Sequence, residues 1–178
     1  MRMVLVRKAA VVMAMVLANS AIAQTVDEYH MKAAFVFNFA KFIQWPPEVF
    51  KTPGDPLVIC VLGQDQMTNS LREAARGNAI DGRKVVVRQV SVGQLSCECN
   101  ILFVSSLANK HFRSWLKESA GVLTVGETPG FASDGGVINF KLEDGRVRFE
   151  INVAAAERQQ LHISSKLLSL AQVLKGAP

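Results

Sequence analysis

Cysteine is the residue type in this sequence best suited to chemistry. Cys97 and Cys99 flank a single glutamate, and the third cysteine, Cys60, lies in an apolar run. Closely spaced thiols exchange disulfides, and thiolates bind soft metals such as copper or zinc. None of the three histidines shows ligand spacing with a cysteine or a carboxylate. We therefore expect a structural disulfide from Cys60 to the 97–99 region, with a thiol-redox pair and a metal site as the alternatives.

A nucleotide site and a catalytic site are both poorly supported. Gly63 stands between a strand-like and a helix-like run, but the segment after it lacks the later glycines that let a backbone approach a pyrophosphate. No nucleophile elbow is present, and no hydroxyl or thiol has a recognisable base. The acidic residues that come closest to a catalytic pattern lie in turn-like segments, where acids are common for backbone reasons. The sequence therefore predicts no enzymatic activity, no catalytic residue and no cofactor.

The first 23 residues have the pattern of a secretory signal peptide. A basic start precedes an apolar run at 9–18, which is shorter than the ~20 residues of a membrane-spanning helix. Small residues stand at Ala21 and Ala23. We expect cleavage after Ala23, so that residues 24–178 form one exported domain; an uncleaved anchor is the alternative.

The positive charge of the chain belongs largely to this leader. The formal net charge of the whole chain is +5, and the leader holds three basic and no acidic residues, which leaves +2 for the mature part. The mature part has no cluster of lysine and arginine with interleaved aromatic residues, so we expect no nucleic-acid partner. Export would also place the three cysteines in an oxidising compartment.

A buried helix is the first element expected in the mature domain. The segment Asp27 to Pro47 carries Phe35, Phe39 and Phe42 at the i, i+4, i+7 spacing of one helix face. We expect Trp45-Pro46-Pro47 to end this helix, because a proline ring cannot donate to the helix ladder.

Strand-like and helix-like segments alternate through the rest of the chain. This order predicts a single α/β domain with a central, mainly parallel sheet, a β-hairpin at one edge and flanking helices. The predicted strands are 57–63, 84–90, 100–106, 122–126, 137–142 and 146–152; the predicted helices are 67–76, 108–120, a short one capped by Asn152, and a final one that begins near Ser164 and continues to Leu174.

The hairpin region is the candidate recognition surface. Ile138, Phe140 and Glu150 of the hairpin, with Ala156 in the short helix after it, bring apolar and charged groups together. We expect these groups to reach solvent, where an apolar patch marks a partner site. The alternative is that they pack beneath the last helix.

Several segments together resemble the YfiR-like family of exported bacterial proteins, and they cover nearly the whole mature chain in order. The segments are Ala34-Phe35, Asn38-Phe39, Lys41-Phe42 with Trp45-Pro46, Cys60-Val61-Leu62-Gly63, Cys99-Asn100-Ile101-Leu102-Phe103-Val104, Leu123-Thr124-Val125-Gly126-Glu127, Gly135-Gly136, Arg146-Val147-Arg148-Phe149-Glu150-Ile151-Asn152 and Ser164-Ser165-Lys166-Leu167-Leu168.

The resemblance implies a non-enzymatic periplasmic regulator. The family's known representative is a homodimer that represses an inner-membrane diguanylate cyclase by acting on the cyclase's periplasmic sensor region. An outer-membrane lipoprotein relieves this repression, so that cyclic-di-GMP output and biofilm formation follow the periplasmic state. For this chain the resemblance implies a disulfide between Cys60 and Cys99. The representative's second bridge has no counterpart, because 133–142 contain no cysteine, and Cys97 becomes the odd thiol.

Two other functions remain as alternatives at this point. One is a periplasmic small-ligand-binding protein with a pocket near Trp45 and the ends of the parallel strands. The other is a thiol-redox enzyme that uses Cys97.

Overall fold

The computed structural model describes residues 28–63, 65–91, 98–105 and 120–174. The predicted leader, its cleavage site, Cys97 and almost all of the predicted helix at 108–120 lie outside the described residues.

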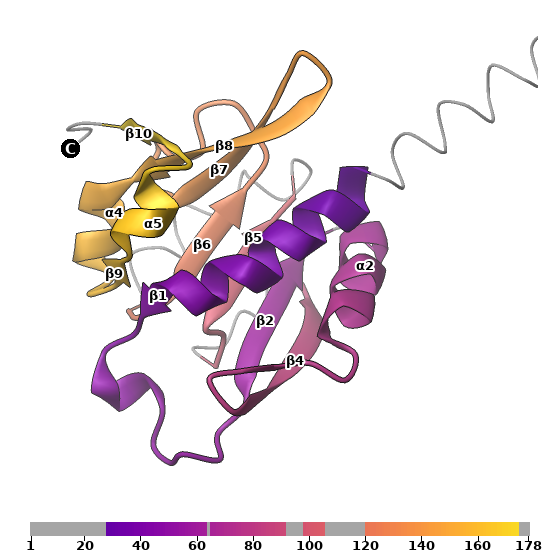
Figure 1. Cartoon of the computed structure of the whole chain (residues 1–178), viewed down its shortest axis with the longest axis vertical. Helices are drawn as coiled ribbons and strands as arrows, with labels where there is room; N and C mark the ends of the chain where they lie inside the picture. Colours follow the sequence, from indigo (N-terminus) through magenta and orange to yellow (C-terminus); the bar gives the residue numbers. More distant parts are fainter. Residues whose placement is uncertain (1–27, 64, 92–97, 106–119, 175–178) are drawn as a thin grey trace, which may run out of the picture.

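A mainly parallel sheet forms the framework of the described chain (Figure 1). Its strand order is β10-β8-β7-β6-β5-β2-β4-β3, and only the β7–β8 and β3–β4 pairs are antiparallel. This arrangement confirms the predicted fold class. The strands are β2 (Leu57–Leu62), β3 (Ala79–Ile80), β4 (Arg83–Val90), β5 (Ile101–Val104), β6 (Leu123–Gly126), β7 (Ile138–Glu143), β8 (Arg146–Asn152) and β10 (Gln172–Leu174).

The three central strands are buried along their whole length. Every residue of β2, β5 and β6 is buried. Strands of a parallel sheet are covered on both faces and therefore consist of nearly continuous apolar runs, as these do. Helix α2 (Asp65–Ala75) follows β2 and buries Met67 and Leu71, as the sequence predicts.

The N-terminal helix, described over residues 28–39, crosses one face of the sheet (Figure 1). It is shorter than predicted. The chain tightens into a 3-10 turn, η1 (Ala40–Phe42), and then extends into β1 (Ile43–Gln44), which pairs antiparallel with β9 (His162–Ile163). The partner strand gives this segment ladder hydrogen bonds that a continued helix would forgo. A second 3-10 turn, η2 (Pro47–Val49), begins at the second proline.

The C-terminal part confirms one predicted helix and corrects another. Helix α4 (Val153–Arg158) begins as predicted at Asn152, whose side-chain oxygen accepts a hydrogen bond from the backbone N–H of Ala155 at 2.9 Å. The predicted final helix is wrong: α5 (Ser165–Leu168) has one turn, and the chain then forms β10 parallel to β8. Pairing with β8 gives the backbone N–H and C=O groups of residues 172–174 hydrogen-bond partners. This gain outweighs the weak helical pattern of the segment.

The loop between β6 and β7 is held by one aromatic side chain. Phe131 is fully buried, and its ring lies over Gly126 and Gly136. A Cβ atom at either glycine would lie within 2.3 Å or 2.1 Å of ring carbons. Both glycines are therefore required by close packing.

We predict that Gly126→Ala destabilises the protein by about 1–3 kcal/mol, because the added methyl group forces the Phe131 ring out of its site. Urea unfolding measures this change. Gly54→Ala is the matched control, since the nearest atom to its added Cβ is 3.9 Å away. Equal stabilities of the two variants would contradict the prediction.

Candidate functional site

Cys60 and Cys99 form a disulfide, the pair that the family resemblance implied. Their Cα atoms are 5.8 Å apart, and both residues are buried. Neither is therefore a free thiol. No group of three or more histidine, cysteine or acidic residues that could hold a metal ion occurs in the described ranges.

The four residues predicted to bind a partner are buried, with exposed fractions of at most 4%. Ile138 and Phe140 lie on the sheet face beneath the N-terminal helix, and Ala156 belongs to the same apolar core. Glu150 points to a buried polar cluster instead. The expectation that these side chains reach solvent is wrong: the N-terminal helix covers Ile138 and Phe140, and Glu150 is enclosed by its polar partners on the other face of the hairpin. A contact between these four residues and a partner stays a prediction.

The polar cluster around Glu150 joins three strands. Its carboxylate accepts a hydrogen bond from the Asn139 amide at 3.2 Å and forms an ion pair with Lys141, N to O distance 2.5 Å. The Lys141 ammonium also donates to the Gln172 side chain at 3.3 Å. Asn139 and Lys141 lie on β7, Glu150 on β8 and Gln172 on β10, so one lysine connects the hairpin to the end strand.

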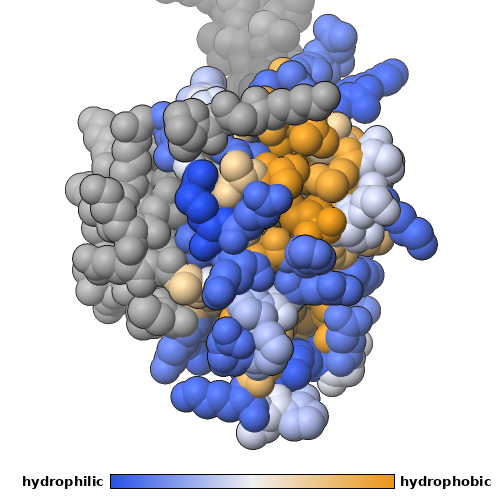
Figure 2. All heavy atoms as spheres, turned by 90° about the vertical axis from the view of Figure 1, so that its left-hand side faces the viewer, coloured by the Kyte–Doolittle hydropathy of each residue, from blue (hydrophilic) through white to orange (hydrophobic). Residues whose placement is uncertain are grey.

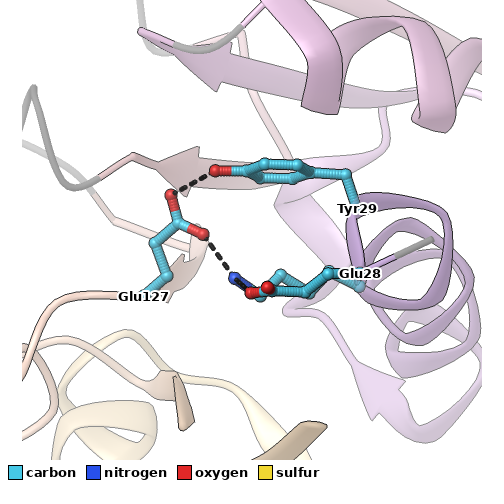
Figure 3. Close-up of polar contacts among 4 residues, drawn as sticks. Glu28, Tyr29 and Glu127 are labelled. Atoms are coloured by element: carbon cyan, nitrogen blue, oxygen red, sulfur yellow. Dashed lines mark hydrogen bonds and ion pairs between the residues drawn. The ribbon is translucent and has the colours of Figure 1, made fainter. Parts of the chain in front are cut away.

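A second polar cluster fixes the N-terminal helix to the sheet (Figure 3). Glu127 follows the last residue of β6, and its carboxylate points toward the helix. One oxygen lies 2.7 Å from the Lys32 ammonium, and the other accepts a hydrogen bond from the Tyr29 hydroxyl at 3.4 Å. Lys32 also pairs with Glu28, one helical turn earlier, at 2.5 Å. The side chains of Lys32 and Glu127 are 8% and 6% exposed, so this ion pair is shielded from water.

Burial and charge shift the pKa values in this cluster. Burial alone lowers the pKa of Lys32, but hydrogen bonds and charges from Glu127 and Glu28 outweigh it and raise that pKa above its usual 10.5. Burial, followed by the charge of Glu127, raises the pKa of Tyr29 above 10.0. Both groups therefore hold their protons more tightly in the folded protein.

The sequence analysis missed this cluster. A lysine within an otherwise apolar helix signals that an acidic partner is buried with it. Glu127 lies 95 residues away in sequence, however, and nothing in the sequence distinguishes it from the other acids.

A hollow of about 510 Å³ opens where the chain enters β2, β5 and β6. Trp45 stands at its margin, where the indole N–H donates to the backbone oxygen of Asn100 at 3.4 Å. The predicted pocket near Trp45 thus has a counterpart, but at the amino ends of the strands. The hollow is lined by Pro46, Glu48, Val49, Phe50, Lys51, Asp55, Pro56, Val58, Arg88, Glu98, Cys99, Asn100, Ala120, Gly121 and Gln160.

Gln160 in this lining has an unusual backbone. Its φ is +57°, and it follows the C-terminus of α4, a position that glycine normally occupies. A side chain in this conformation costs about 1–2 kcal/mol. The wall of the hollow thus contains a residue whose backbone is strained.

Two known groups of proteins are similar to this chain, one in sequence and one in structure. A family model described as YfiR/HmsC-like matches residues 29–172. A crystal structure of a conserved domain protein from Vibrio cholerae O1 biovar El Tor strain N16961 is similar, with a TM-score of 0.50 and 13% identity. The match covers 66% of this chain and 54% of that protein, so this chain spans about half of its length and shares the fold alone.

No curated protein matches the chain. No helix in the described part has the length and apolar character needed to cross a bilayer.

We predict that Tyr29→Phe makes the alkaline loss of stability shallower. Raised pKa values of Tyr29 and Lys32 add stability that is complete below their unfolded pKa values, 10.0 and 10.5, and is lost as pH rises through the folded values. Urea unfolding from about pH 8 to pH 11 measures this loss. Tyr29 is the only tyrosine, so ultraviolet absorbance reports its ionisation directly. A folded-state tyrosine pKa at or below the unfolded one would contradict the prediction.

Proposed function

The chain belongs to the YfiR/HmsC-like family, and we propose that it represses an inner-membrane diguanylate cyclase by binding the cyclase's periplasmic sensor region. The family is periplasmic and regulatory. The observation that carries the proposal is the match of the family model to residues 29–172, which include nearly all of the described domain. Repression would lower cyclic-di-GMP and biofilm formation, and an outer-membrane lipoprotein would relieve it by sequestering this protein.

The proposed repression needs binding energy and no catalysis. A repressor must bind the inactive conformation of the cyclase more tightly than the active one. Moving a two-state equilibrium from 1:99 to 99:1 requires a preference of about 10⁴-fold, or ~5.5 kcal/mol.

We place the contact on the outward side chains of the hairpin and α4. The four residues named from the sequence are buried, but the same elements expose Leu142, Arg146 and Arg148 on the hairpin and Arg158 on α4. Arg148 makes no ion pair with any described residue. It is therefore available to an acidic group on the sensor region or the lipoprotein.

We predict that deletion of the gene raises cellular cyclic-di-GMP and that Arg148→Glu fails to restore repression, because the reversed charge repels an acidic partner site. Nucleotide measurement by mass spectrometry checks both results. Arg72→Glu is the matched control: Arg72 is also exposed but lies on α2, away from the hairpin, so this variant should repress normally.

Circular dichroism of the purified variants confirms folding before the comparison is made. Unchanged cyclic-di-GMP on deletion would overturn the regulatory proposal. Normal repression by Arg148→Glu would overturn only the proposed surface.

The hollow beside Trp45 favours a second candidate function, the binding of a small periplasmic ligand. Its volume falls within the ~300–1,000 Å³ of small-molecule sites. The wall combines apolar groups from Pro46, Val49 and Phe50 with polar side chains from Arg88 and Gln160.

We predict that the ultrafiltered small-molecule fraction of a periplasmic extract quenches Trp45 fluorescence saturably in a Trp115→Phe background, because Trp45 borders the hollow. Gln160→Gly removes a side chain from the wall of the hollow and relieves the backbone strain at this position. This variant should therefore raise the stability of the protein and weaken the quenching of Trp45 fluorescence. Absence of saturable quenching would overturn the ligand-binding function and leave the repressor proposal intact.

A further inference from the structure

A second hollow lies between the C-terminal end of α2 and strand β4. This α2–β4 groove has a volume of about 590 Å³. Three basic side chains line it: Arg72 from the last turn of α2, Arg76 directly after the helix, and Lys84 from β4. All three residues are exposed, and the other described residues of the lining are uncharged. Two separate elements thus bring positive charge to one hollow.

The positive charges of the groove are not neutralised within the described chain. None of the three basic residues forms an ion pair with a described residue. The acid next to Arg72 on the helix, Glu73, pairs instead with His30 at 3.2 Å. Arg72 and Arg76 are four residues apart, a spacing at which like charges on a helix repel each other. The fold therefore retains an unfavourable arrangement that a bound anion would relieve.

The end of the helix does not explain all of this charge. A helix C-terminus favours nearby cations, which could account for Arg72 and Arg76. The side-chain amide of Asn78 already donates to the backbone oxygen of Ala74 in the last turn, at 2.9 Å. Lys84 belongs to another element, β4, where it pairs with Ala79 of β3. Its position on the groove is set by the sheet and not by the helix.

Two glycines leave the backbone of the groove accessible. Gly77 has a φ of +72° and Gly82 a φ of +76°, and both line the groove. No atom lies within 4 Å of the position that a Cβ would take at either residue. A ligand can therefore approach the main chain closely at both positions.

We propose that the α2–β4 groove binds the phosphate group of an anionic ligand. A guanidinium group matches two phosphate oxygens at once, and a lysine ammonium adds a point charge. Because the groove is open and its basic side chains are exposed, the phosphate can be free in solution or belong to the headgroup of an anionic lipid. This site goes beyond the proposed regulatory function and takes no part in it.

The groove is remote from the surface that we propose for the cyclase. Strand β4 lies next to one end of the sheet and β8 of the hairpin next to the other. Helix α2 is on the right-hand side of Figure 1, whereas α4 and α5 are on the left. Figure 2 views that left-hand side, where hydrophobic residues gather into one region bordered by hydrophilic ones. Phosphate binding and repression should therefore be separable.

We expect inorganic phosphate, titrated into the mature full-length protein at constant ionic strength, to shift the backbone amide NMR signals of Gly77 and Gly82 saturably. Arg76→Gln and Lys84→Gln should each weaken this binding about fivefold, because each removes one of the converging positive charges. Lys166→Gln is the matched control: it removes an exposed lysine on α5, away from the groove, and should leave the binding unchanged.

Vesicle sedimentation distinguishes the two sources of phosphate. Sedimentation with phosphatidylglycerol vesicles, but not with phosphatidylcholine vesicles, would assign the site to an anionic lipid headgroup, provided that Arg76→Gln and Lys84→Gln weaken it. Phosphate binding without vesicle binding would assign the site to a soluble phosphate. Either result supports the proposed chemistry of the groove.

Absence of both a saturable shift and vesicle binding overturns the inference. Binding that Arg76→Gln and Lys84→Gln leave unchanged also overturns it, as does an equal loss in Lys166→Gln, which would reflect net charge alone. These tests use purified protein without a cyclase, so their failure leaves repression to be judged by the cyclic-di-GMP measurement. Because the groove takes no part in repression, Arg72→Glu remains the control there.

Discussion

The structure depends on covering a sheet whose central strands are buried on both faces. The N-terminal helix supplies one cover, and the contact is aromatic: the ring centroid of Phe39 lies 5.0 Å from that of Phe149 and 5.8 Å from that of Phe140. Such ring pairs contribute about 0.5–1.5 kcal/mol each beyond the area they bury. Because Phe140 and Phe149 belong to the two strands of the hairpin, the helix sets the hairpin's position as well as closing the core.

Two ion pairs supplement this apolar contact, one beside the helix and one on the opposite face of the hairpin. Lys32 with Glu127 ties the helix to the end of β6, and Lys141 with Glu150 ties β7 to β8. Buried ion pairs add little net stability compared with apolar packing, but losing one partner is costly. Aromatic side chains alone permit a helix to slide or rotate on a sheet. The Lys32–Glu127 pair has one satisfied geometry, so it favours a single placement of the helix on the sheet. The Lys141–Glu150 pair acts within the hairpin, where it holds β7 to β8.

Local patterns explain what could be predicted from the sequence. The apolar run at 57–62, the turn residues Asp144 and Gly145 and the cap at Asn152 act within a few residues, and each forms the expected element. The errors come from long-range partners. Residues 172–174 continue a helical pattern, yet β8 offers an open edge that the local sequence does not contain. The partner of Lys32 is likewise set by the fold, and the burial of Ile138 and Phe140 depends on a helix about 100 residues earlier in the chain.

Lys141 links the hairpin to the end strand of the sheet. Its ammonium contacts both Glu150 of β8 and Gln172 of β10, so β10 is joined by side-chain contacts to the hairpin on which we place the cyclase contact. A binding surface that is already ordered loses less conformational entropy when a partner binds, so these contacts favour the proposed recognition. The regulation that we propose then follows from a difference in affinity for two cyclase conformations, and this difference requires no catalytic group.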